Sequence, residues 1–143
     1  MRTLSLDVGD KTIGIAVTDL LNITAQGLET YYRTTVKADV KHIEALCRDL
    51  TVTTIVYGNP LHMNGDVSQQ SQKVFSFIKQ LQKKIQYGTA IDWQIDFCPI
   101  DERLTSMQAE GIMKMADLSR KERAKHVDKI AAQLILEQYL ATR

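Results

Sequence analysis

The chain has 143 residues, a formal charge of +1, and a composition that is 44% hydrophobic and 24% charged. This length accommodates one hydrophobic core and is too short for two ordinary domains, and the composition excludes disordered and fibrous proteins. We therefore expect residues 1–143 to form a single domain. The small net charge leaves a nucleic-acid partner open, because phosphate binding depends on where positive side chains cluster.

The first predicted elements form a β-hairpin. Residues 3–8 alternate between apolar and polar side chains, and residues 12–19 repeat this two-residue period. Gly9 and Asp10 between them supply a turn. The β-prone residues 28–36 predict a third, antiparallel strand.

Helical spacing begins in the next segment. Apolar side chains recur every three or four positions over residues 40–50, with Asp39 as the expected N-cap. Residues 54–57 are apolar and are followed by the breakers Gly58-Asn59-Pro60, which predicts a buried central strand. A second amphipathic helix is predicted over residues 67–85.

The last third of the chain predicts one more strand and two helices. Alternation over residues 93–97 indicates the strand, a capping box at residues 105–108 begins a helix, and residues 127–139 form a final helix. Three strands followed by alternating helices and strands predict a mixed sheet covered by helices. A ligand site is expected at the strand ends, near residues 58–66 and 101–105.

Three carboxylates stand in positions that favour a functional role. Asp7 lies in a mostly apolar strand, where burial of an ionised carboxylate is costly unless a cation or hydrogen-bond donors compensate. Glu102 emerges at the end of the last predicted strand. Asp128 shares a helical row with alanines, which allow close approach to a sheet.

Each carboxylate also has a structural alternative. Asp7 can accept hydrogen bonds from the turn that follows it. Glu102 can belong to an exposed cluster of ion pairs, and alternation does not decide whether Asp101 or Glu102 points inward. Asp128 can pair with Lys125 or Lys129.

The ligand types favour a hard cation over zinc. The carboxylates come without a His or Cys ligand set, which suits Mg2+ or Mn2+. Two such ions roughly 4 Å apart would activate a water and stabilise the leaving oxygen in phosphodiester hydrolysis. Cys47 and Cys98 lie far apart in the chain, which argues against a zinc site or a disulfide-rich scaffold.

Several polar residues are candidates for substrate contacts. The segment 114–129 is locally basic and is predicted either to contact a phosphate backbone or to form a solvated helix face. Arg103 is predicted to bind the scissile phosphate or to pair with a neighbouring acid. The full set of predicted substrate-binding residues is Lys11, Asn59, Asn64, Arg103, Arg120, Lys121 and Arg123.

An ordered set of motifs resembles the YqgF/RuvX family. DxG openings alone also occur in sugar kinases, but the ordered set with the DERLT motif is specific. The matching blocks are Leu6-Asp7-Val8-Gly9, residues 11–17, Gly58-Asn59-Pro60-Leu61, Asp101-Glu102-Arg103-Leu104-Thr105 and residues 127–132. The chain departs from the usual pattern at Asn59, His62 and Asn64, which leaves the contacts of this loop open.

The resemblance implies an RNase H-like α/β fold, with three layers (α/β/α) around a mixed five-stranded sheet. It also implies a nuclease whose metal ligands are Asp7, Glu102 and Asp128, acting on pre-16S ribosomal RNA or, as the alternative, on Holliday-junction DNA. A nucleic-acid-binding module without turnover and an ATP-binding fragment related to sugar kinases are the rival interpretations. We expect a cytoplasmic protein without a signal peptide or membrane span, either monomeric or homodimeric.

Overall fold

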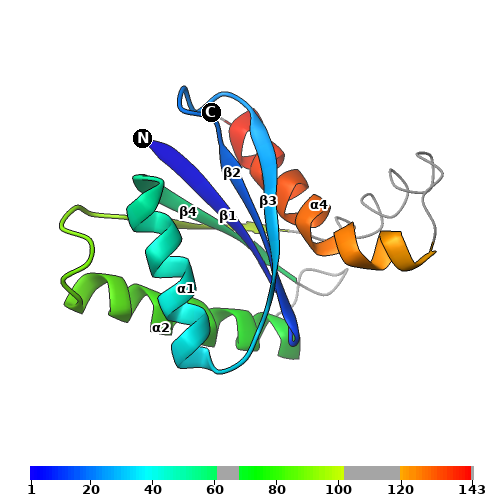
Figure 1. The fold of residues 1–143 in the computed structure, drawn as a ribbon, viewed down its shortest axis with the longest axis horizontal. Coiled ribbons are helices and arrows are strands. Elements are labelled where there is room, and N and C mark those ends of the chain that lie inside the picture. Colours follow the sequence, from blue (N-terminus) through cyan, green and yellow to red (C-terminus); the bar gives the residue numbers. More distant parts are fainter. Residues whose placement is uncertain (61–67, 102–119, 143) are drawn as a thin grey trace.

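The computed structural model describes residues 1–60, 68–101 and 120–142, and for residues 120–128 it describes the backbone alone. The described part contains three strands, then a helix, a strand, a helix, a strand and a long helix (Figure 1). In chain order these are β1 (Arg2–Val8), β2 (Thr12–Thr18), β3 (Ala25–Tyr32), α1 (Val36–Asp49), β4 (Val52–Asn59), α2 (Gln69–Tyr87), β5 (Asp96–Asp101) and α4 (Arg120–Ala141). None of these helices is long and apolar enough to cross a membrane.

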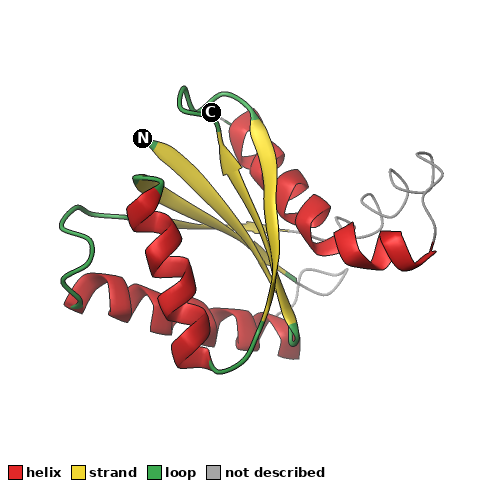
Figure 2. Ribbon diagram, in the orientation of Figure 1, coloured by secondary structure: helices red, strands yellow, loops and turns green. Residues whose placement is uncertain are grey.

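The five strands form one mixed sheet in the order β3-β2-β1-β4-β5. The pairs β1–β2 and β2–β3 are antiparallel, whereas β1–β4 and β4–β5 are parallel. Helices α1 and α2 cover one face and α4 covers the other (Figure 2). This confirms the predicted RNase H-like arrangement of three layers. Because parallel strands end at the same edge of a sheet, Val8, Asn59 and Asp101 mark one edge.

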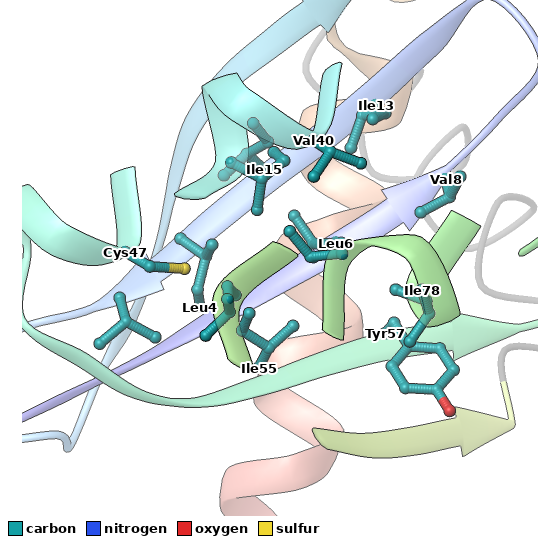
Figure 3. Close-up of a cluster of buried hydrophobic side chains, with 14 of the residues drawn as sticks. Leu4, Leu6, Val8, Ile13, Ile15, Val40, Cys47, Ile55, Tyr57 and Ile78 are labelled. Carbon is teal, nitrogen blue, oxygen red and sulfur yellow. The ribbon is translucent and has the colours of Figure 1, made fainter. Parts of the chain in front are cut away.

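Alternation along β1 assigns its side chains to the two faces. Leu4, Leu6 and Val8 lie in the larger core, which is packed against α1 and α2 (Figure 3). The intervening residues of β1 therefore face α4. Ser5 confirms this, because its hydroxyl donates a 2.8 Å hydrogen bond to the carbonyl oxygen of Ala132 in α4.

Helix α4 lies close against its face of the sheet. The second core cluster contains the small Ala16 together with Ala132. On β3, a Cβ added at Gly27 would lie 2.8 Å from Cγ of Lys129, so a larger residue there would displace the Lys129 side chain. Small residues on both surfaces thus let the helix backbone approach the strands.

We expect Ser5→Ala to destabilise the fold by about 1 kcal/mol, because it removes a buried hydrogen bond between β1 and α4. Urea unfolding measures this difference. Ser76→Ala, at an exposed position on α2, is the matched control and should change stability by less than about 0.5 kcal/mol. Equal stability of the two variants would show that the contact with α4 contributes nothing.

The predicted bounds of two strands were wrong. β3 covers residues 25–32 and not 28–36, because the segment after Tyr32 turns towards α1. β5 begins at Asp96, so Trp93 precedes it. The indole Nε1 of Trp93 donates a 2.7 Å hydrogen bond to the carbonyl oxygen of Val52. The Trp93 side chain packs against the core beside the sheet, and Trp93 is not part of the strand.

The predicted N-cap of the first helix was also wrong. Thr35 caps α1, since its hydroxyl accepts a hydrogen bond from the amide of Ala38. Asp39 lies four residues after this cap, in the first turn of α1, and is buried. In α2 the N-cap is Ser68, whereas Val67 and the capping box at residues 105–108 lie outside the described residues.

Candidate active site

Asp7 lies near the carboxyl end of β1, in the centre of the sheet. By alternation it shares the face of Ser5 that α4 covers, and its side chain is half-buried. In the antiparallel register, Asp7 pairs with Gly14 on β2. Because directly paired residues share a face, Gly14 lies beside Asp7 and brings no side chain into that space. A carboxylate therefore lies on the sheet face that α4 covers, beside a residue that has no side chain.

Helix α4 carries Asp128 towards the same part of the sheet. Ala132 contacts Ser5, and position 128 precedes it by about one helical turn. Figure 1 shows that α4 runs back against the direction of β1, so Asp128 and Asp7 are displaced from this contact in the same direction. The Asp128 side chain lies outside the described residues, and its approach to Asp7 stays a prediction.

The last strand distinguishes two neighbouring acids. Cys98 and Ile100 pack with the apolar cluster beneath α4. Asp101 follows Ile100, so it lies on the opposite face, and it pairs in register with Asn59. Asp101 therefore does not share the face of Asp7. Glu102 lies outside the described residues.

Asn59 has a role within the fold. Its side-chain oxygen accepts a 2.6 Å hydrogen bond from the hydroxyl of Ser71 in the first turn of α2. The Ser68 hydroxyl donates to the carbonyl oxygen of Pro60 nearby. Asn59 thus joins the end of β4 to the start of α2, on the face opposite Asp7. A substrate contact by its amide nitrogen stays a prediction.

The other predicted substrate-binding residues are only partly placed. Lys11 is exposed in the turn between β1 and β2. Asn64 and Arg103 lie outside the described residues. Arg120, Lys121 and Arg123 begin α4, but their side chains lie outside the described part. The structure therefore brings Lys11 to the edge where Asp7 lies, and it does not test the rest.

Sequence reasoning missed Arg33. Its guanidinium donates from a terminal nitrogen to the carbonyl oxygen of Gly9 at 2.7 Å and from Nε to Asp39 Oδ2 at 2.9 Å. The same group lies 4.9 Å from the centre of the Phe77 ring in α2. The backbone amide of Arg33 also donates to the carbonyl oxygen of Lys11 at 2.9 Å. Arg33 therefore holds the turn that follows Asp7 against α1 and α2.

The carboxylate of Asp39 is the partner that fixes Arg33. Burial would raise its pKa, but hydrogen bonds from Arg33, the Thr34 amide and the Tyr31 hydroxyl outweigh burial and hold the pKa below the usual 3.8. Asp39 is 1% exposed and Arg33 17% exposed. No local motif signals the Arg33–Asp39 pair, because the Gly9 carbonyl that Arg33 binds lies 24 residues earlier in the chain.

Of the three predicted metal ligands, the structure describes the side chain of Asp7 alone. Within residues 1–60, 68–101 and 129–142, no group of three His, Cys, Asp or Glu side chains is placed to hold a metal ion. This does not test the prediction, since Glu102 and the Asp128 side chain are outside that part. Burial raises the pKa of the Cys47 thiol to about 12, so this cysteine is a neutral core residue.

The chain matches the family model RuvX, described as Holliday junction resolvase, over residues 1–142. It is 47% identical over 140 residues to a protein of Clostridium tetani, covering 98% of this chain and 96% of the relative. A protein of Clostridium novyi is 44% identical over 140 residues, with 98% of both chains covered. Both relatives are named "Putative pre-16S rRNA nuclease".

Solved structures show the same fold at low sequence identity. The Fowlpox virus resolvase, in a complex with substrate Holliday junction DNA, aligns with a TM-score of 0.59 at 12% identity, covering 99% of this chain and 98% of the resolvase. This likeness confirms the fold, and the whole-length family match confirms the resemblance carried by the sequence motifs. The chain belongs to the RuvX family.

Proposed function

We propose that this protein is a Mg2+- or Mn2+-dependent nuclease that hydrolyses phosphodiester bonds at the carboxyl edge of the β-sheet. The observation that carries the proposal is the position of Asp7. It is a half-buried carboxylate at the end of the central strand, beneath α4 and beside a glycine, in a chain of a resolvase family.

Asp7, Glu102 and Asp128 are the proposed metal ligands. The donor chemistry fits, because carboxylate oxygens are the ligands that Mg2+ and Mn2+ prefer. When bound, such a cation activates water and stabilises charge on the leaving oxygen. Asp101 is excluded from this set by its place on the other face of β5. Arg103 and Lys11 are proposed to hold the substrate phosphates.

Arg33 is proposed to keep the Asp7 carboxylate in position. It binds the carbonyl of Gly9, two residues after Asp7, and its own position is fixed by a buried carboxylate. A charge-assisted hydrogen bond of this kind restricts the strand end on which the metal ligand sits. Preorganisation of the ligand before substrate binds lowers the cost of reaching the reactive geometry.

Precursor 16S ribosomal RNA is the favoured substrate, because relatives at 44% and 47% identity are named as nucleases of this RNA. Processing of this RNA would place the protein in the cytoplasm. Four-way DNA junctions are the second candidate, favoured by the family description and by the fold shared with a junction-bound resolvase.

The proposal is tested by incubating the purified protein with precursor 16S RNA and with a four-way DNA junction, each with and without Mn2+. We expect cleavage of the RNA that requires the cation. Preferential cleavage of the junction would transfer the activity to branched DNA. Binding of both substrates without any cation-dependent cleavage would contradict a nuclease and favour the module without turnover.

A further inference from the structure

Two neighbouring hollows lie on the face of the molecule opposite α4. The first, of about 820 Å³, is bounded by the β1–β2 turn and the starts of α1 and α2. The second, of about 490 Å³, lies between the two helices farther along. Gln80 lines both hollows, so they adjoin at this residue. We call them together the α1–α2 groove.

Positive side chains dominate this groove. Six basic side chains line it, against two acidic ones, in a chain whose net charge is only +1. The basic residues are Lys11, Arg33, Lys37, Lys41, Lys73 and Lys84, and the acidic ones are Asp10 and Asp39. The groove is therefore a concentrated positive surface on a nearly neutral protein.

The two acids are already paired. Asp39 binds Arg33. Oδ1 of Asp10 lies 3.4 Å from Nζ of Lys73, and the side chains of Asp10 and Lys73 are both well exposed. Among the residues that the structure describes, Lys37, Lys41 and Lys84 form no ion pair. The positive charge of the second hollow is therefore available to an anionic ligand.

Helical spacing sets these lysines on both walls of the groove. Lys37 and Lys41 are one turn apart on α1, and Lys84 lies one turn after Gln80 on α2. At its other end the groove reaches Lys11, in the turn that follows Asp7. A chain of regularly spaced negative charges leaving the proposed active site would thus meet positive side chains in succession.

Uncharged polar side chains also line the groove, together with the apolar Val36, Val40 and Phe77. Gln69, Gln72, Gln80 and Ser76 offer hydrogen bonds without adding charge. This mixture suits phosphates and sugar hydroxyls, because lysines neutralise the backbone while amides and hydroxyls bind it without reading sequence.

We infer that the α1–α2 groove binds the phosphodiester backbone of the substrate strand, beyond the bond that is cleaved. The inference rests on the proposed function for its choice of polyanion. It adds a second contact surface, separate from the basic segment 114–129 singled out in the sequence. The groove fixes how the strand leaves the site, and it is indifferent to base sequence.

The test compares two double variants with the same change in charge. Lys37→Gln/Lys41→Gln removes two lysines of the groove, one turn apart on α1. Lys79→Gln/Lys83→Gln removes two exposed lysines, one turn apart on α2, that do not line it. Affinity for a fluorescent single-stranded RNA, and for DNA of the same sequence, is measured by anisotropy in EDTA over a range of salt concentrations.

We expect the groove variant to bind RNA about tenfold more weakly at about 0.1 M salt, with a salt slope reduced by about 1.4, since each lost phosphate contact on a single strand removes about 0.7. The control should keep the wild-type slope. Equal losses in both variants, or absence of binding by the wild type, would overturn the inference. An equal effect on RNA and DNA indicates phosphate recognition, and an effect on RNA alone indicates additional contact with the ribose hydroxyl.

Cleavage is assayed separately with Mn2+, so the two proposals can fail independently. Loss of affinity in the groove variant without any cleavage by the wild type would support the groove and remove the nuclease assignment. Cation-dependent cleavage with unchanged affinity in the groove variant would support the nuclease and remove the groove.

Discussion

Asp7→Asn is expected to lower the rate of RNA cleavage about a thousandfold, because a metal ion contributes several kcal/mol to the transition state and a neutral amide is a poor ligand. The substitution keeps the shape of the side chain. The fold should therefore persist, which circular dichroism and thermal unfolding will verify. Single-turnover cleavage at saturating Mn2+ measures the effect.

The matched control is Asp49→Asn, which removes the same charge from a residue that lines neither the proposed active site nor the α1–α2 groove. Asp49 ends α1, and its side chain is 63% exposed and pairs with the exposed Arg48. Its loss should leave the rate within about twofold, as expected for an exposed pair of small energetic value. A rate for Asp7→Asn within the range of this control would refute the assignment of Asp7 as a metal ligand.

Arg33→Met is expected to destabilise the protein by about 3 kcal/mol, because it leaves the carboxylate of Asp39 buried without its cation. For a domain of this size such a loss lowers the melting temperature by about 10 °C. Arg48→Met is the control, since Arg48 and Asp49 form an exposed pair, 51% and 63% exposed, whose removal should cost less than about 0.5 kcal/mol. Equal effects of the two substitutions would contradict the role of the buried pair.

The difference in stability between wild type and Arg33→Met should depend on pH if the Asp39 carboxylate causes it. Because the pKa of Asp39 lies below 3.8 in the folded state, the pair contributes its full stability above that value and loses it as the pH falls through the folded pKa. The stability gap between wild type and Arg33→Met should therefore narrow between about pH 5 and pH 2. A constant gap over this range would assign the destabilisation to lost packing on Phe77.

Local pattern in the sequence determined most of the elements. Alternation of apolar residues predicts the hairpin that carries Asp7, and helical spacing predicts α1 and α2, because each period reports which side of an element is buried. The errors fell at element ends. Aspartate is a residue type that often caps helices, yet in the structure Asp39 pairs with Arg33 and lies within the first turn of α1. Caps are reliable only when no tertiary partner competes for the side chain.

The candidate site was only partly predictable for a similar reason. Asp7 stood out because a carboxylate in an apolar strand is costly, Glu102 because it follows a strand, and Asp128 because it shares a helical row with alanines. The family motifs then implied that the three act together. The predicted substrate contact of Asn59 stays a prediction, and the structure adds a role that the sequence did not predict, because the side-chain oxygen of Asn59 joins β4 to α2. A polar residue at a strand end has the same sequence signature whether it serves a ligand or the next helix.

Asp7, the hairpin and the family motifs could thus be identified from the sequence alone, since all depend on residue type and short spacings. The tertiary structure decided which helix covers each face, and hence that Asp7 lies beneath α4 while Asp101 does not. It also joined Arg33 to Gly9 and gathered lysines of α1 and α2 into one groove. Such contacts connect residues far apart in the chain, and their distances are set by strand order and helix packing, which no local period encodes.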